Sequence, residues 1–268
     1  MIKRIQDIKV SRLLLAAFTM IVLIFIVAPI IVVTIVSFSS TNILQFPPPE
    51  LSFRWYESYL GDTTWRAATV RSIIVALLTA FFSFLIGFPA AIGIVRSNFK
   101  GKNLIRVFTL TPLAFPKIII AIGLYFLYVK AHIVGTMVGL VIGHTLIALP
   151  FTILVLTAGL QGIDERLEWA AQNLGATQFQ TFTKITIPML WPSIVASLIF
   201  CFIESFDDII LSMFLSSVSK PTLPVQIWIS VQQWMDPTIA AVSVILLLIT
   251  IVGLLLISLV NKQMQKFN

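Results

Sequence analysis

The feature that most constrains the fold is a series of long segments without a charged residue. Four of them are Leu13–Phe38, Ser72–Val95, Ala131–Gly162 and Thr238–Val260. Each exceeds the roughly 18 apolar residues at which a membrane-spanning helix becomes the default interpretation. Only 11% of the residues are charged and 58% are hydrophobic, and one soluble core could not bury so much apolar surface. The sequence therefore predicts an all-α membrane protein.

Two further segments, Leu104–Tyr128 and Trp191–Leu215, are equally apolar but contain isolated charges. We count both as spans and expect six transmembrane helices. The apolar part of the first span is too long for the roughly 7–15 residues of a signal peptide, and no A-x-A-like cleavage site follows it. We therefore expect the first span to be retained as a helix.

The basic residues are concentrated in alternate connections between the predicted spans. Twelve of the 18 lysines and arginines lie there: Lys3, Arg4, Lys9, Arg12, Arg96, Lys100, Lys102, Arg106, Arg166, Lys184, Lys262 and Lys266. Cytoplasmic loops carry such an excess of basic residues, so we expect both termini in the cytoplasm. Topology then explains the net charge of +7, and we predict no nucleic-acid partner.

Several kinds of chemical site have no signal in the sequence. No segment matches G-x-x-x-x-G-K-[ST], so we expect no phosphate-binding loop and no ATP hydrolysis by this chain. The one cysteine, Cys201, lies within a span and can form neither an internal disulfide nor a zinc cluster. We interpret His144 as a residue that hydrogen-bonds between helices rather than a metal ligand. The prediction is a transport protein without enzymatic activity, metal or cofactor.

The longest cytoplasmic connection, residues 161–190, has the pattern of two short helices. Asp164 and Glu165 suit the start of the first helix, where carboxylates complement the helix dipole. Gly175 suits its end. Apolar residues at three-residue spacing predict a second, amphipathic helix, and they are Phe179, Phe182 and Ile185. We expect Pro188 to end this helix before the fifth span begins.

The same connection resembles the EAA loop of ABC-importer permeases, in which E-A-A-x-x-x-G is separated by nine residues from I-x-L-P. The matching residues are Ala170, Ala171, Gly175, Ile185 and Pro188, and Ile187 replaces the leucine. The resemblance implies the type I ABC-importer permease fold. It also implies that the two helices dock into a groove on an ATPase subunit. When that subunit closes, the docked helices would pass the movement on to the membrane-spanning helices.

The loop departs from the family pattern at one position. Trp169 stands where the family has glutamate, and Glu168 lies one residue earlier. One residue is about 100° around a helix, so Glu168 would not simply replace the family's acid. The polar contact of that acid is therefore in question, whereas docking is not, and Trp169 could fill an apolar groove instead. We assign Glu168 and Trp169 to the ATPase-coupling site together with the matching residues above.

The fifth span contains three carboxylates, Glu204, Asp207 and Asp208, at positions i, i+3 and i+4. This spacing predicts that they share one face of a helix. Acids within the membrane cost at least about 2.5–3.5 kcal/mol each, so they normally face a cavity or an opposite charge. Two interpretations stay open: an acidic patch along a translocation path for a cation, or structural pairing with Lys117 of the third span.

The resemblance extends toward the second permease of spermidine/putrescine importers. The stretches that carry it are Phe206-Asp207-Asp208, Thr222-Leu223-Pro224, Ile227-Trp228 and Asp236-Pro237. It implies polyamines or related cationic amines as substrates, and we place Trp228 on the substrate pathway with Lys117 and the three acids. Opines and aminobutyrate-type solutes are the alternative substrates.

The family also implies partners and a domain division. Such permeases work in the lipid of the bacterial inner membrane with a second permease, two ATP-binding subunits and an extracytoplasmic solute-binding protein. We divide the chain into an N-terminal segment (1–65), a core ABC permease domain (66–261) with five spans, and a cytoplasmic tail (262–268).

A different class of function is a proton-coupled secondary transporter in which the acids of the fifth span relay protons. The coupling loop argues against this class, as does the lack of the broken spans that such carriers often show. A membrane enzyme finds no support, because no histidine pair or nucleophile–base set accompanies the acids.

Overall fold

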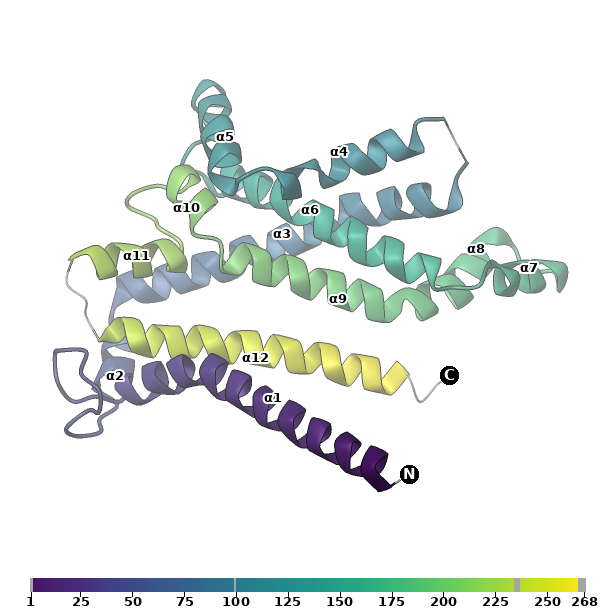
Figure 1. Ribbon diagram of the computed structural model, residues 1–268. Coiled ribbons are helices and arrows are strands. Elements are labelled where there is room, and N and C mark those ends of the chain that lie inside the picture. Colours follow the sequence, from purple (N-terminus) through teal and green to yellow (C-terminus); the bar gives the residue numbers. More distant parts are fainter. Residues whose placement is uncertain (1, 99, 234–236, 265–268) are drawn as a thin grey trace. The chain divides into compact units, whose positions relative to one another are not determined.

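The computed structural model describes residues 2–98, 100–233 and 237–264, and most of them are helical (Figure 1). Asp236, Lys266 and the end of the predicted tail, residues 265–268, lie outside the described residues. The helices are α1 (Ile2–Val36), α2 (Arg54–Gly61), α3 (Thr63–Arg96), α4 (Lys102–Ala114), α5 (Lys117–Ala131), α6 (Met137–Gln161), α7 (Glu165–Asn173), α8 (Gln178–Thr181), the π-helix η1 (Phe182–Thr186), α9 (Ile187–Phe206), α10 (Ile210–Leu215), α11 (Leu223–Gln233) and α12 (Thr238–Met264).

Four helical segments of the described chain are long and apolar enough to cross a membrane. They are Arg12–Val36, Thr63–Arg96, Met137–Gln161 and Gln178–Phe206. The pair α4 and α5 makes a fifth if the two helices count as one broken span. Over Thr238–Gly253, α12 contributes a shorter apolar segment. The all-helical membrane fold is therefore confirmed, with four or five candidate spans by length and composition.

The chain divides into two compact units. One contains residues up to Asp62 together with Ile229–Leu248. In it, the aromatic rings of Phe38, Phe53 and Tyr56 pack together at centroid distances of 5.2–6.1 Å. The hydroxyls of Ser37 and Tyr56 lie 2.7 Å apart. These contacts hold the start of α2 against the end of α1.

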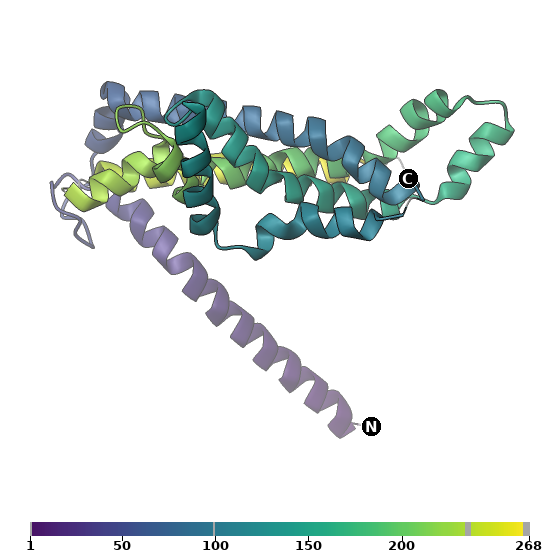
Figure 2. The same cartoon turned by 90° about the horizontal axis from the view of Figure 1, so that it is seen from above.

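The second unit contains Thr63–Trp228 and the chain from Ile249 onward. Its helices α3, α6 and α9 run side by side in both views (Figures 1 and 2). The most buried of its candidate spans is α6. Its leucines Leu140, Leu156 and Leu160 are almost fully buried in the apolar clusters between the helices. Helices α7 and α8 project beyond this bundle at one end (Figure 2).

Two glycines allow the helices of this bundle to approach closely. A Cβ atom at Gly87 of α3 would lie 2.7 Å from Cγ2 of Thr152. At Gly159 of α6, a Cβ atom would clash with the side chain of Ser193. Membrane helices often pack through such small residues, since little apolar driving force exists between helices in lipid.

The third predicted span is not one continuous helix, so that prediction is wrong. Helices α4 and α5 meet at an angle of 101°, with Phe115 in an extended conformation. Pro116 is the physical cause, because it donates no backbone hydrogen bond and disfavours helical geometry at the residue before it. Lys117 therefore begins α5 instead of lying inside a helix.

The fifth predicted span is also broken. Helix α9 ends at Phe206 and α10 begins at Ile210. Oδ1 of Asp208 accepts a hydrogen bond from the backbone N–H of Leu211 at 2.7 Å. This contact caps the start of α10 and competes with a continuous helix. The prediction of three carboxylates on one helical face is therefore wrong, and so is the expected lack of broken spans.

Candidate functional site

Helix α7 is defined by local capping signals. At its start, Oδ1 of Asp164 accepts a hydrogen bond from the N–H of Arg166 at 2.9 Å. At its end, Gly175 has a φ of +92°, and the N–H of Ala176 donates to the carbonyl of Ala171 at 3.0 Å. This is the Schellman pattern, which needs a left-handed residue after the helix. The predicted end of the helix at Gly175 is confirmed.

The second short helix of the loop continues into the fifth span. It begins with a capping box between Thr177 and Gln180, passes through the π-helix η1, and runs on as α9. Pro188 lies in the first turn of α9. The prediction that Pro188 ends the second helix is therefore wrong. The wider π turn and the first turn of α9 accommodate a residue without an N–H.

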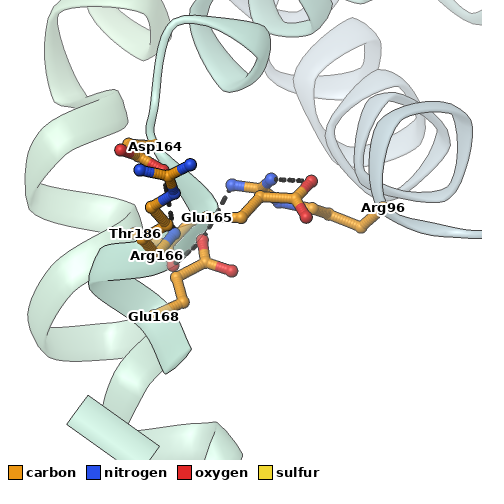
Figure 3. Close-up of polar contacts among 6 residues, drawn as sticks. All are labelled: Arg96, Asp164, Glu165, Arg166, Glu168 and Thr186. Atoms are coloured by element: carbon orange, nitrogen blue, oxygen red, sulfur yellow. Dashed lines mark hydrogen bonds and ion pairs between the residues drawn. The ribbon is translucent and has the colours of Figure 1, made fainter. Parts of the chain in front are cut away.

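An anchor network, formed by Arg96, Glu165, Glu168 and Thr186, joins three elements around this loop (Figure 3). Arg96 ends α3, and its guanidinium lies 2.5 Å from Glu165 and 2.8 Å from Glu168. The hydroxyl of Thr186 in η1 donates to the same Glu168 oxygen at 2.9 Å. Glu168 is therefore directed into the protein, where it ties α7 to α3 and to the start of α9.

Sequence reasoning missed two members of the anchor network, Arg96 and Thr186. Arg96 was interpreted only as a topology-setting charge. The signal that could have found it is the pair of acids one helical turn apart, Glu165 and Glu168, which share one face of α7. Thr186 gives no comparable signal.

The remaining residues assigned to the coupling site lie on or near the surface of the loop. Trp169 is 58% exposed. Ala170, Gly175 and Pro188 are exposed, whereas Ala171 and Ile185 are half-buried. Leu174 and Phe179 add further exposed apolar surface at the tip. Glu168 and Trp169 thus point to different surroundings, one inward and one outward.

An ion cluster, formed by Lys117, Glu204 and Asp208, lies where the two broken helices meet. Nζ of Lys117 lies 2.5 Å from Oε1 of Glu204 and 3.1 Å from Oδ2 of Asp208. The side chain of Asp208 is only 5% exposed. Asp207 is exposed and forms no ion pair within the described part of the chain. The structure therefore brings three of the four predicted pathway charges together and leaves one carboxylate unpaired.

His144 of α6 bridges the break between α9 and α10. Its Nδ1 lies 2.8 Å from the hydroxyl of Ser205, and its Nε2 lies 3.2 Å from the hydroxyl of Ser212. Ser205 also donates to Thr79 of α3 at 3.3 Å. The predicted role of His144 in hydrogen bonding between helices is confirmed. Within the described residues, no group of three potential metal ligands occurs.

Trp228, predicted for the substrate pathway, lies on α11 and is 40% exposed. Two hydrogen bonds between side chains of α3 and the backbone hold the start of α11 and the residues just before it. The N–H of Leu223 donates to the hydroxyl of Ser72 at 2.8 Å, and Arg71 donates to the carbonyl of Pro221 at 2.7 Å. No described hydrogen bond joins Trp228 to the ion cluster.

Two relatives are similar along most of their length. The chain is 28% identical over 259 residues to the spermidine/putrescine transport system permease protein PotC of Escherichia coli (strain K12), covering 97% of this chain and 98% of the relative. It is 30% identical over 230 residues to the putrescine transport system permease protein PotI of the same strain, covering 83% and 82%.

Solved structures of ABC transporters have the same fold. A bacterial transporter involved in the import of the acidic polysaccharide alginate matches with a TM-score of 0.70 at 16% identity, over 95% of this chain and 96% of that chain. The MetNI methionine transporter matches with a TM-score of 0.62 at 19% identity, over 74% and 94%. At these sequence identities the two comparisons support the shared fold, and they carry no information about the substrate.

The family described as "Binding-protein-dependent transport system inner membrane component" matches residues 83–266. This segment is more than half of the chain and contains α7, η1 and the ion-cluster acids. The chain therefore belongs to this family of inner membrane components and is a permease subunit of an ABC importer.

Proposed function

We propose that this permease subunit forms half of a translocation pathway for polyamines or related cationic amines. The observation that carries the substrate class is the similarity to permeases named for spermidine and putrescine, which extends over 97% and 83% of the chain. A path for a cation needs acidic groups, and the break after α9 supplies one that is unpaired, Asp207.

The proposal includes six transmembrane helices with both termini in the cytoplasm. Four segments and the broken pair supply five spans. Helix α12 supplies the sixth, because its 27 residues would extend about 40 Å at a rise of 1.5 Å per residue. The excess of basic residues near the chain ends and before α4 supports the orientation. The division into segment 1–65, core domain 66–261 and tail 262–268 belongs to this proposal.

Coupling to ATP hydrolysis would occur through α7. Two ATP-binding subunits, a second permease and an extracytoplasmic solute-binding protein complete the proposed transporter. The exposed apolar residues Trp169, Leu174 and Phe179 support docking of the loop into an apolar groove. The anchor network would then carry movement of α7 to α3 and, through η1, to α9, since Glu168 is hydrogen-bonded to Arg96 of α3 and to Thr186 of η1.

The substrate site would lie where α9 breaks. The last carbonyl groups of α9 present the negative end of a helix dipole, which favours a cation. Asp207 caps this end and is exposed, whereas Glu204 and Asp208 share the positive charge of Lys117. We therefore assign contact with the cation to Asp207 and structural support to the ion cluster.

Uptake of radiolabelled spermidine by cells that express the complete transporter tests this assignment. Asp207→Asn should lower uptake about tenfold or more, because a hydrogen bond to a charged group contributes about 1.5–3 kcal/mol. Co-purification of the ATPase subunit should be unchanged. The control is Glu57→Gln, which removes an exposed carboxylate of α2. Unchanged spermidine and putrescine uptake by Asp207→Asn would remove this residue from the pathway.

A further inference from the structure

A cavity of about 720 Å³ lies at the end of the bundle from which α7 projects. The last residues of α3, the first turns of α4, the end of α6 and the start of α7 line it. It contains no residue of the ion cluster or of the proposed substrate pathway, and it shares Trp169 with the proposed coupling contact.

The lining of this cavity is rich in basic side chains. Arg96, Lys102, Arg106 and Arg166 all contribute to it. Arg96 is occupied by the acids of the anchor network. The other three basic residues form no ion pair in the part of the chain that the structure describes.

Two acids also line the cavity, and both have partners. Oδ1 of Asp164 accepts the backbone N–H of Arg166 at the start of α7, and Glu165 contacts Arg96. The four basic and two acidic side chains of the lining leave a formal net charge of +2, and a bound anion would lower the repulsion between the basic groups. The cavity therefore has the charge of an anion site.

The surface beside the cavity favours one class of anion. Helix α4 contains no buried residue, and its Leu104, Val107 and Phe108 are 61–67% exposed. Lys102 and Arg106, one helical turn apart, lie on the same helix. An apolar surface beside a basic cavity suits a lipid that places its acyl chains along α4 and its headgroup between the basic side chains. Trp169, which also lines the cavity, is a residue type common at membrane interfaces.

We propose that this cavity binds the phosphate group of an anionic phospholipid, a chemistry that free phosphate shares. The site is independent of the substrate class and requires only that this end of the bundle lies at a membrane surface. A phosphate bound here would lie beside Arg96 and thus beside the anchor of α7.

Native mass spectrometry of the full chain in detergent, titrated with phosphatidylglycerol or phosphatidylcholine, tests the proposal. We expect preferential binding of phosphatidylglycerol. Each basic residue near a membrane surface contributes about fivefold to such binding, so Lys102→Gln/Arg106→Gln should weaken it about 25-fold. The matched control, Lys130→Gln/Lys220→Gln, removes two exposed charges outside the cavity and should bind as the wild type does.

A charge-preserving variant separates loss of binding from loss of folding. Lys102→Arg/Arg106→Lys should retain phosphatidylglycerol binding, since the site recognises charge. Equal loss of binding in the cavity variant and the control, or equal binding of the two lipids, would overturn the proposal. Inorganic phosphate is titrated separately. If it binds the wild type and phosphatidylglycerol does not, the lipid assignment is wrong. None of these measurements involves uptake, so their failure is distinct from failure of the proposed transport function.

Discussion

The anchor network and the ion cluster share one arrangement, in which a single basic side chain bridges two carboxylates. The ion-pair distances are similar, at 2.5 and 2.8 Å for Arg96 and 2.5 and 3.1 Å for Lys117. Their surroundings differ. Glu165 is 49% exposed beside the loop, whereas Asp208 is 5% exposed between apolar helices. Because charges interact more strongly where water is excluded, we expect the contact of Asp208 to be stronger than that of Glu165, although Lys117 is 36% exposed and Arg96 only 18%.

This difference suits the two proposed roles. A loop that follows an ATPase through a cycle benefits from contacts of moderate strength that can be rearranged. Two broken helices need a permanent support, because their interrupted backbone and their charges are both costly in lipid. The following predictions test whether the two sites really differ in strength.

The largest effect is expected for Lys117→Met, which leaves Glu204 and Asp208 without their cation. Removing one partner of a fully buried ion pair typically costs about 3–5 kcal/mol, which is an upper limit here because the Lys117 side chain is 36% exposed. Thermal unfolding of the purified chain should show a markedly lower midpoint. Lys130→Met, at an exposed position in the same helix, is the control.

The double variant Lys117→Met/Glu204→Gln should recover part of this loss, because one uncompensated charge has been removed. If Lys117→Met instead unfolds at the midpoint of the wild type, the ion cluster is solvated. The contrast with the anchor network would then disappear.

A smaller effect is expected for Arg96→Gln. The variant removes both charge-assisted contacts to α7, which are worth about 1.5–3 kcal/mol each at most. Glu168 keeps its hydrogen bond from Thr186, so the bundle should stay folded. Faster hydrogen exchange confined to α7 and reduced uptake are the expected results. Lys100→Gln, which neutralises an exposed lysine four residues after Arg96, should change neither hydrogen exchange nor uptake. Global unfolding of Arg96→Gln would count against a local anchor.

Gly175→Arg tests the loop without touching a charge pair. A residue with a side chain costs about 1–2 kcal/mol at the left-handed φ of this position. The end of α7 should shift, and transport should be lost while membrane insertion remains normal. Gly61→Arg is the matched control, because nothing lies within 4 Å of a Cβ atom there and its φ is not left-handed. Normal uptake by Gly175→Arg would refute the coupling role of the loop.

Local signals made part of the structure predictable from the sequence. The apolar runs identified α1, α3 and α6, because hydropathy depends on composition within one segment. The end of α7 at Gly175 followed from backbone geometry that glycine adopts at little cost. His144 was interpreted correctly because a polar residue in an apolar helix needs a partner.

The features that were missed depend on distant contacts or on the path of the backbone. A hydropathy pattern is the same for a straight helix and for one broken at Phe115–Pro116. The break after Phe206 depends on Asp208, which reaches both Lys117, 91 residues earlier, and the backbone of α10. Arg96 and Glu168 are 72 residues apart. The spacing of Glu165 and Glu168 indicates a basic partner, but it does not identify Arg96 as that partner.

The smallest effect is expected for Thr186→Val, which removes one hydroxyl and keeps the shape of the side chain. A single hydrogen bond contributes about 0.5–1.5 kcal/mol, and Glu168 would still be held by Arg96. Uptake should fall only slightly, and hydrogen exchange in α7 should rise less than in Arg96→Gln. The double variant Thr186→Val/Arg96→Gln should then exceed the sum of the single effects, because Glu168 loses both of its donors. Additive effects would mean that Thr186 and Arg96 act on α7 independently, and that Glu168 does not connect α3 to the start of α9.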